Sequence, residues 1–274
     1  MILLLAALLA ASTPAEIVAA APPAAWRAVA PENLLIMETA AGTMAIELAP
    51  EFAPAHVDAI RTLVKAGRFD GGAIVRVQDN YVVQWAAKPN PAATAKPLPA
   101  EYERPATGLA ITPLGAPDAY AEAGFAKGGP VAQDRVTGTA WLAHCYGMVG
   151  VGRDNPPDTG DGSELYAVIG HGPRHLDRNI ALVGRVVAGI EPHAALPRGS
   201  EAMGFYKGSA QQTPITRVRL GSAVADAPRF EVMDTGSASF AEYKAARANR
   251  TGFFVRPAGA SDLCNVVVPV RPAK

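Results

Sequence analysis

The segment that most constrains the fold of this chain is Ile74–Gln84, which reads IVRVQDNYVVQ. Alternation along its first half is typical of a β-strand and predicts Ile74, Arg76 and Gln78 on one face. A turn-forming segment then leads into a second extended run, Tyr81–Gln84. A guanidinium is always charged, so Arg76 needs water, a partner or a function. Taken alone, the segment favours an edge-strand arginine that faces solvent.

The residues before this segment give a defined order of elements. Two strand-like runs, Leu35–Thr39 and Thr43–Leu48, are joined by Ala40–Gly42, which is a hairpin signal. A helix is predicted next, because Pro54 suits a first helical turn and Gly67 suits the end of a helix. Its apolar stripe consists of Val57, Ile60, Leu63 and Val64. The order is therefore hairpin, helix, arginine strand and glutamine strand.

In this order the chain resembles the cyclophilin family of peptidyl-prolyl cis-trans isomerases, as a divergent member of bacterial type. Matching residues cover roughly 34–220 in two blocks, and several motifs follow one another in the family's order. The matching segments are Glu38–Pro54, Lys65–Gly71, Val75–Gln84, Gly147–Asn155, Asp161–Gly170 and His175–Leu196.

The resemblance implies a mostly β fold: a closed antiparallel eight-stranded barrel capped by two helices. We expect the cyclophilin-like domain at residues 26–222, with a long insertion at about 85–146 and a C-terminal extension, 223–274, packed on the barrel. In the extension, Phe240–Arg250 is predicted to be helical, and Gly252–Arg256 and Asn265–Val270 to be extended. The insertion is a candidate partner contact, and the alternative is a loop that only covers one end of the barrel.

The resemblance also implies a site without a cofactor. Arg76 would donate a hydrogen bond to the proline nitrogen, which gains a lone pair only when the amide twists, and Gln84 would hold the substrate backbone. Matching positions that line the proline pocket are Tyr81, Val82, Tyr166 and Leu176. Taken alone, a residue such as Tyr81, Tyr166 or Leu176 more often contributes to ordinary barrel packing.

The chain departs from the family's pattern at several pocket positions. Gly152 and Arg153 replace an alanine and a polar residue that contact the peptide backbone in relatives, and Glu164 replaces a common glutamine. Ile180 replaces a histidine at the rim, His175 a bulky residue, and Val82 a larger methionine. These changes predict altered peptide preference, weak catalysis or weak binding of cyclosporin-type inhibitors.

Composition excludes some functions without selecting one. Lysine plus arginine and aspartate plus glutamate both number 25, so no net charge favours nucleic acid or an anionic membrane. The 24 prolines and 26 glycines suit a turn-rich β domain better than a helical bundle. His171 and His175 flank a Gly-Pro pair that prevents an α-helix from aligning them on a metal. Gly150–Gly152 lacks the context of a dinucleotide loop. We therefore predict no metal and no cofactor.

The N-terminus has the pattern of a signal peptide. Ile2–Ala11 is apolar and too short to span a bilayer, and small residues up to Ala21 offer cleavage sites. We expect residues 1–21 to be removed, which leaves a periplasmic or secreted chain without stable membrane insertion, and the alternative is a disordered or membrane-peripheral leader. Export would permit a disulfide between Cys145 and Cys264, and two separate buried thiols are the alternative.

The predicted function is isomerisation of X–Pro bonds in exported proteins during folding, with proline-containing polypeptides as clients. One alternative is a proline-peptide-binding chaperone or adaptor with little catalysis. A more remote alternative is a structural domain of the envelope that interacts through the insertion and the tail.

Overall fold

The computed structural model describes residues 12–89 and 98–273. Its centre is an eight-stranded barrel whose neighbouring strands are all antiparallel. The strands are β2 (Leu34–Thr39), β3 (Gly42–Leu48), β4 (Ala73–Val77), β5 (Val82–Ala86), β11 (Met148–Val151), β12 (Glu164–Val168), β13 (Leu182–Ala188) and β14 (Thr213–Leu220). The barrel closes in the order β11-β12-β5-β4-β14-β2-β3-β13, which confirms the predicted fold class.

Two local signals in the sequence produce the elements expected from them. The β2–β3 hairpin turns at Ala40 and Ala41, where Gly42 takes a φ of 138° that is available to glycine. Helix α2 (Pro54–Lys65) starts at its proline and turns a buried stripe toward the barrel. Its N-terminus is capped from the insertion, since the Glu101 carboxylate accepts hydrogen bonds from the backbone N–H groups of Ala55 and His56 at 2.8 and 2.9 Å. The second helix, α3 (Glu191–Ala194), is only one turn long.

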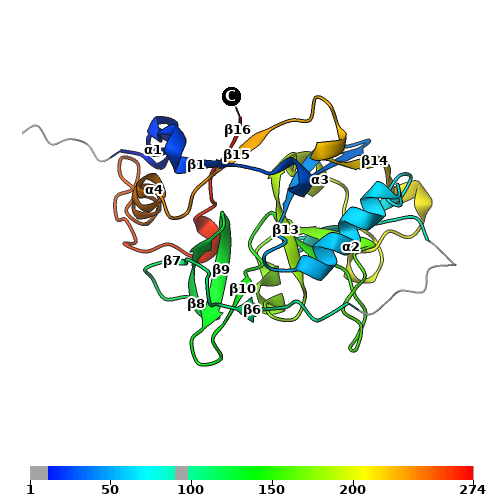
Figure 1. Ribbon diagram of the computed structural model, residues 1–274, viewed down its shortest axis with the longest axis horizontal. Helices are drawn as coiled ribbons and strands as arrows, with labels where there is room; N and C mark the ends of the chain where they lie inside the picture. Colours follow the sequence, from blue (N-terminus) through cyan, green and yellow to red (C-terminus); the bar gives the residue numbers. More distant parts are fainter. Residues whose placement is uncertain (1–11, 90–97, 274) are drawn as a thin grey trace, which may run out of the picture.

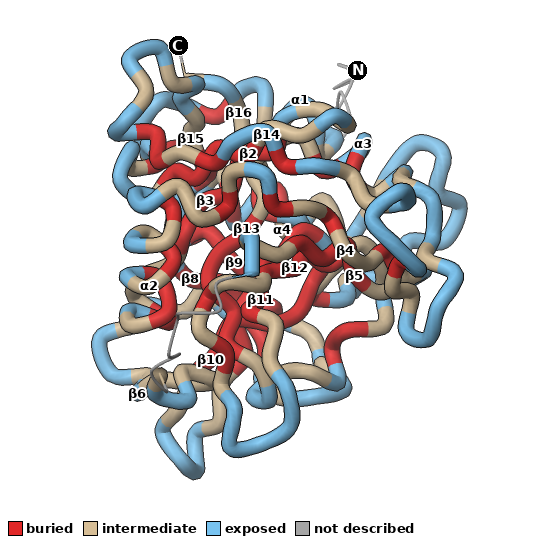
Figure 2. The backbone as a smooth tube through the Cα atoms, turned by 90° about the vertical axis from the view of Figure 1, so that its right-hand side faces the viewer, coloured by how far each residue is buried: buried red, intermediate tan, exposed pale blue. Residues whose placement is uncertain are grey.

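The barrel wall is buried on both faces along one side. Leu35 and Met37 of β2 point into the barrel, whereas Ile36, between them, belongs to a second apolar cluster outside it. The same alternation on β12 sends Leu165 inward and Tyr166 outward. Figure 2 shows the buried segments running through the middle of the molecule. The outward-facing residues therefore need a cover, and the insertion and the two chain ends provide it.

Two smaller sheets form this cover and lie beside the barrel (Figure 1). The insertion contains β6 (Arg104–Pro105), β7 (Thr112–Pro113), β8 (Glu122–Ala126), β9 (Gly129–Asp134) and β10 (Thr139–Leu142), in the order β6-β10-β9-β8-β7. The chain ends contribute β1 (Trp26–Ala28), β15 (Phe230–Met233) and β16 (Val270–Pro272), with β15 in the middle. Helices α1 (Pro14–Ala20) and α4 (Ala238–Ala248) pack against each other on this side. Phe125 of β8 meets Phe240 of α4 edge to face, with ring centroids 5.0 Å apart.

Seven short 3-10 helices complete the described secondary structure. They are η1 (Pro23–Ala25), η2 (Pro31–Asn33), η3 (Gly172–Leu176), η4 (Ala202–Gly204), η5 (Ser209–Gln211), η6 (Gly221–Ala223) and η7 (Leu263–Asn265). Among the described residues, no helix has both the length and the apolar character needed to cross a membrane.

A disulfide between Cys145 and Cys264 joins the end of the insertion to the C-terminal extension. The two Cα atoms are 4.9 Å apart, although 119 residues separate them in the chain. The structure therefore contains the disulfide and not the alternative of two separate buried thiols.

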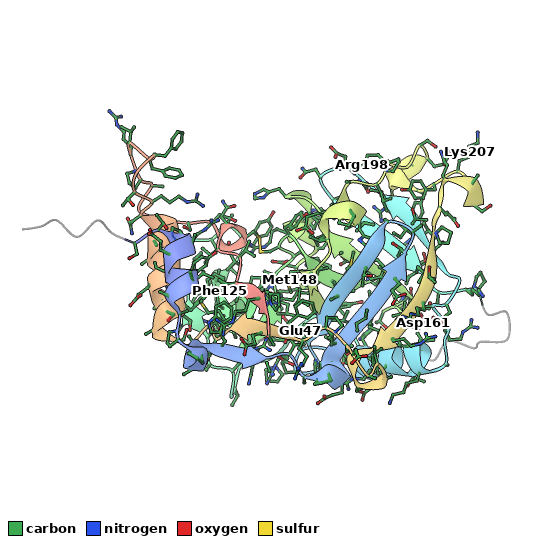
Figure 3. All side chains as sticks on the ribbon, turned by 90° about the horizontal axis from the view of Figure 1, so that it is seen from above. Glu47, Phe125, Met148, Asp161, Arg198 and Lys207 are labelled. Carbon is green, nitrogen blue, oxygen red and sulfur yellow. A yellow bond between two sulfur atoms is a disulfide. The ribbon has the colours of Figure 1, made fainter. Side chains whose placement is uncertain are left out.

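A buried ion pair lies at the junction between the barrel and the extension. Glu47 of β3 pairs with Arg27 of β1 and with Arg185 of β13, whose Nε atom lies 3.5 Å from the carboxylate. An Nη1–H group of Arg185 also donates to the Val268 carbonyl oxygen at 3.3 Å. In Figure 3, Glu47 and Met148 lie between Phe125 on the cover and the far side of the barrel. The junction is thus polar at its centre and apolar around it.

The extended runs predicted for the C-terminal extension are wrong, whereas its helix is confirmed as α4. Residues 252–256 form an exposed loop, in which Phe253 and Val255 are more than nine-tenths exposed and have no neighbouring strand. In the second run, only Val270 is part of a strand, because η7 occupies the chain next to the disulfide. At the N-terminus, residues 1–11 of the predicted signal peptide lie outside the described residues, and α1 falls within the remainder of it.

Candidate active site

A β-bulge orients Arg76. The register between β4 and β5 shifts between Ile74 and Arg76: these two residues of β4 pair with Trp85 and Gln84, which are neighbours on β5. The extra residue on β4 interrupts the alternation of its side chains between the two faces. Ile74 is fully buried inside the barrel, whereas Arg76 points to the outer surface. The prediction that these two side chains share a face is therefore wrong, because it assumed an unbroken strand.

The Arg76 guanidinium is held in a half-buried position by three acceptors. Its Nη1 donates to Gln84 Oε1 at 3.1 Å, its Nε donates to the Met203 carbonyl oxygen at 2.6 Å, and its Nη2 donates to Gln78. The rings of Tyr81 and Phe205 lie within cation–π distance, at 5.4 and 5.2 Å. Burial lowers the pKa of Arg76, which nevertheless remains charged at any physiological pH.

Gln84 links this arginine to a carboxylate on the next strand. Its side-chain oxygen accepts from Arg76, and its amide nitrogen donates to Glu164 Oε2 at 2.9 Å. Both contacts specify one orientation of the amide. Burial raises the pKa of Glu164, and the hydrogen bond from Gln84 opposes that rise. The three side chains form a row across β4, β5 and β12.

All ten residues predicted for the site line one open groove with a volume of about 670 Å³. They are Arg76, Tyr81, Val82, Gln84, Gly152, Arg153, Glu164, Tyr166, Leu176 and Ile180. Seven further lining residues were not predicted: Asp154, Asp158, Gly160, Asp161, Ser163, Met203 and Phe205. The first five lie in or next to the segment that joins the matching motifs around Gly152 and Glu164, so their position along the chain could have suggested them. Met203 and Phe205 lie in a loop for which the sequence carries no signal.

The apolar lining of the groove comes from β5 and the residue before it, from β12, and from η3 and the segment after it. These lining residues, here called the apolar pocket, are Tyr81, Val82, Tyr166, Leu176 and Ile180. Burial raises the pKa of Tyr81. Its ring stacks on His175 with centroids 5.8 Å apart, and its hydroxyl lies 3.3 Å from Nε2 of that histidine. Because His175 Nδ1 is already bonded to the Gly172 carbonyl oxygen, this histidine acts as a support for Tyr81.

Arg153 lies at the rim of the groove with its guanidinium occupied. It donates to the Asn179 carbonyl oxygen from Nε and Nη2, at 3.1 and 2.9 Å, and to the Asp154 carbonyl oxygen at 2.6 Å. It also lies 5.7 Å from the Tyr102 ring centroid. These bonds fix the loop around Gly152 against the segment that carries Ile180.

Comparison with known proteins agrees with this geometry. Residues 34–224 match the family described as cyclophilin type peptidyl-prolyl cis-trans isomerase/CLD. Proteins named probable peptidyl-prolyl cis-trans isomerase from Brucella suis and Brucella abortus are each 28% identical over 177 residues, which cover 63% of this chain and 75% of theirs. The crystal structure of cyclophilin AquaCyp293 from Hirschia baltica is similar with a TM-score of 0.73 and 25% identity, and the match covers 91% of this chain and 94% of that one. The chain belongs to the cyclophilin family and is a peptidyl-prolyl cis-trans isomerase of cyclophilin type.

Proposed function

We propose that this isomerase acts on X–Pro bonds of exported proteins during their folding, with Arg76 as the catalytic donor. The observation that carries the assignment of Arg76 is its position beside the apolar pocket, where two of its five N–H groups bond to no described residue. A proline ring in the pocket would bring its nitrogen toward these free donors.

The chemistry requires a donor of this kind. The planar amide resists rotation with a barrier of about 18–20 kcal/mol, because its nitrogen lone pair is delocalised. As the bond twists, the lone pair returns to the proline nitrogen and can accept a hydrogen bond. A guanidinium fixed beforehand stabilises the twisted state more than either planar state, and this difference lowers the barrier.

Gln84 serves two purposes in this proposal. Its oxygen orients Arg76, and its amide group faces the groove next to Glu164, where a substrate carbonyl oxygen could replace that carboxylate as acceptor. Gly152 directly follows β11, and a Cβ atom there would lie 2.9 Å from the Cβ atom of Glu164. The absence of this Cβ leaves room for an extended peptide backbone along the groove.

Two features support a role outside the cytoplasm. The Cys145–Cys264 disulfide is stable in an oxidising compartment, and the Ile2–Ala11 segment is apolar in the manner of a signal peptide. We therefore propose a periplasmic or secreted location, which cell fractionation and N-terminal sequencing of the mature protein would test. The sequenced N-terminus would also show whether α1, which packs on α4, remains after processing. A cytoplasmic protein with its first residues intact would contradict export.

The function is tested by refolding a disulfide-containing secreted protein whose slow phase is proline isomerisation. We expect the wild-type protein to accelerate that phase, and Arg76→Ala to remove most of the acceleration. Arg135→Ala is the matched control, because Arg135 is an exposed arginine of the insertion that pairs only with Glu122 among the described residues. Equal acceleration by wild type and Arg76→Ala would contradict the assigned role. Saturable binding of proline peptides without acceleration would instead identify a chaperone or adaptor.

A further inference from the structure

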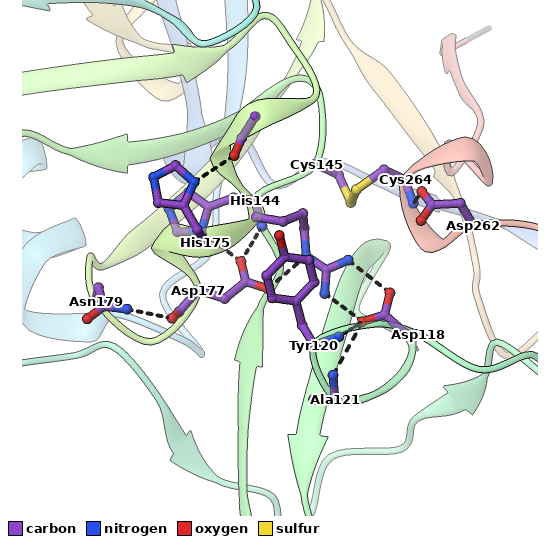
Figure 4. A network of polar contacts seen from close by, with 12 residues as sticks. Asp118, Tyr120, Ala121, His144, Cys145, His175, Asp177, Asn179, Asp262 and Cys264 are labelled. Carbon is purple, nitrogen blue, oxygen red and sulfur yellow. Dashed lines mark hydrogen bonds and ion pairs between the residues drawn. A yellow bond between two sulfur atoms is a disulfide. The ribbon is translucent and has the colours of Figure 1, made fainter.

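A row of buried polar side chains connects the insertion to the proline pocket. Asp118 lies in the loop before β8, His144 follows β10, and Arg174 and Asp177 lie in and just after η3. Their side chains are between 1% and 7% exposed. Figure 4 shows Asp177 between His144 and the guanidinium that pairs with Asp118. None of these four residues lines the groove.

The row ends on Tyr166, one of the residues that line the pocket. The Tyr166 hydroxyl lies 2.9 Å from His144 Nε2, and His144 Nδ1 lies 2.9 Å from Asp177 Oδ1. The Asp177 carboxylate only accepts hydrogen bonds, so His144 Nδ1 carries the proton. Nε2 is then free to accept a hydrogen bond from the Tyr166 hydroxyl. The hydroxyl is therefore directed toward the insertion, and the apolar ring forms the pocket wall.

The strand next to Tyr166 is adapted to this arrangement. Gly150 of β11 pairs with Tyr166 of β12, and a Cβ atom on Gly150 would lie 2.3 Å from the tyrosine oxygen and 2.4 Å from the carbon that bears it. Any larger residue at 150 would thus displace the hydroxyl from its path to His144. The glycine and the histidine together accommodate a tyrosine that could otherwise not lie flat on this strand.

The other end of the row is fixed to the insertion. Arg174 binds the Asp118 carboxylate with two parallel hydrogen bonds of 2.8 and 3.0 Å, and its Nε donates to Asp177 at 2.8 Å. The backbone N–H of His144 also donates to Asp177, at 2.9 Å. Cys145, the next residue, is bonded to Cys264 (Figure 4). His144 is consequently held from three directions.

We propose that His144 is a positioning residue of the peptide site. By accepting a hydrogen bond from the Tyr166 hydroxyl, it keeps that hydroxyl out of the proline pocket. The insertion thereby becomes part of the substrate site without touching the substrate. The inference rests on the proposed use of the groove for X–Pro peptides. The insertion would then both cover the barrel and hold a pocket residue, Tyr166, in place.

The energetic reason lies in the buried hydroxyl. Leaving a buried donor without its acceptor is strongly unfavourable, whereas replacing donor and acceptor together by apolar groups of the same shape is close to neutral. Without His144, the hydroxyl would turn toward water in the groove and occupy part of the proline pocket. A peptide would have to displace it again. Phenylalanine at position 166 has no hydroxyl and would not require the histidine.

A double-mutant cycle tests the proposal. The affinity of the wild-type protein for the tetrapeptide Ala-Ala-Pro-Ala is compared with the affinities of His144→Ala, Tyr166→Phe and the double variant. We expect His144→Ala to weaken binding about tenfold in the wild-type background, and by less than about threefold when it is introduced into Tyr166→Phe. The Michaelis constant of an X–Pro substrate should follow the affinity, while kcat changes by less than about threefold. His193→Ala is the matched control, because His193 is equally buried and bonds to Thr39 and to the Gly189 carbonyl oxygen, away from the groove.

The outcomes separate this inference from the proposed function. Equal weakening by His144→Ala in the wild-type and Tyr166→Phe backgrounds would overturn it, because the histidine would then act through Asp177 or general stability. Unchanged affinity in His144→Ala would also overturn it. Failure of the wild type to bind the peptide would contradict the proposed function and the inference together. Rescue by Tyr166→Phe, with no change in His193→Ala, would support both.

Discussion

Two polar networks meet at the groove, and they differ in what they leave available. The network around Arg76 is open: the guanidinium is half-buried and keeps two N–H groups free of described partners. The network around His144 is closed, because its side chains are buried and the Tyr166 hydroxyl at its end has an acceptor. A group that must bind a transition state needs unused donors at the groove, whereas the closed network contributes only Tyr166 to the groove lining. Changes in the closed network should therefore affect stability and peptide affinity, and changes in the open one should affect rate.

The largest effect on stability is expected for Arg174→Ala. This change leaves the Asp118 and Asp177 carboxylates buried without their shared cation, so we expect the free energy of unfolding to fall by about 3–5 kcal/mol. Denaturant-induced unfolding at pH 7.5 measures it. A loss below about 1 kcal/mol would show that water reaches these carboxylates and that the network is not closed.

Removal of the disulfide should have the next largest effect. Cys264→Ser opens a covalent link across 119 residues, and we expect a loss of about 2–4 kcal/mol in the free energy of unfolding. Thermal unfolding with and without a reductant checks this loss. The reductant should lower the unfolding temperature of the wild type toward that of the variant and leave the unfolding temperature of the variant unchanged. A shift of the same size in both proteins would mean that the reductant acts elsewhere.

The closed network should also make stability depend on pH. Burial lowers the pKa of His144 from its ordinary value of 6.5, and the neighbouring Asp177 offsets only part of this shift. Below pH 6.5 the unfolded chain therefore binds a proton that the folded chain does not, and stability falls as the pH falls. For one proton, the slope is at most about 1.4 kcal/mol per pH unit.

Unfolding measured from pH 7.5 to pH 5.5 should show this slope in the wild type and a smaller one in His144→Gln. Burial also lowers the pKa of His193, so a residual slope of the same sign should persist in the variant. Equal slopes in the two proteins would indicate that His144 has the same pKa in the folded and unfolded states and that water reaches its side chain.

The smallest effect is expected at the edge of the open network. Glu164→Gln retains an acceptor for Gln84 and removes only a half-buried charge, so kcat/KM should change by about threefold or less. Because burial raises the pKa of Glu164, its removal should slightly raise stability at pH 7. A loss of more than about tenfold in kcat/KM would instead place the carboxylate among the catalytic groups.

The sequence was sufficient for the strand residues of the open network, but not for Met203 and Phe205, and it was insufficient for the closed network. Arg76 and Gln84 lie on consecutive strands joined by a short turn, so a hairpin brings them together without any knowledge of the rest of the chain. Local rules failed only at the bulge before Arg76, because a bulge depends on how the partner strand is paired. Tyr166 lies on β12, far from Gln84 along the chain, and was predicted as a pocket residue from the resemblance to the family.

The contact between Tyr166 and His144 depends on tertiary packing, which no local pattern encodes. The histidine follows a strand of the insertion, and its approach to the tyrosine requires Gly150 on a third segment. In the C-terminal extension, Asn265–Val270 was predicted to be extended, but the disulfide and η7 determine the path of the chain there. Phe205 reaches Arg76 from a loop whose conformation is set by the barrel around it.

The most direct test of the account measures binding and catalysis in one experiment on Arg76→Ala. Exchange spectroscopy on an Ala-Pro peptide yields both the dissociation constant and the catalysed rate of cis–trans exchange. We predict a dissociation constant within about threefold of the wild type and a catalysed rate reduced by about 10²–10³-fold, because the guanidinium acts on the twisted state. A variant that exchanges the peptide at the wild-type rate, or one that loses affinity as strongly as rate, would contradict the account.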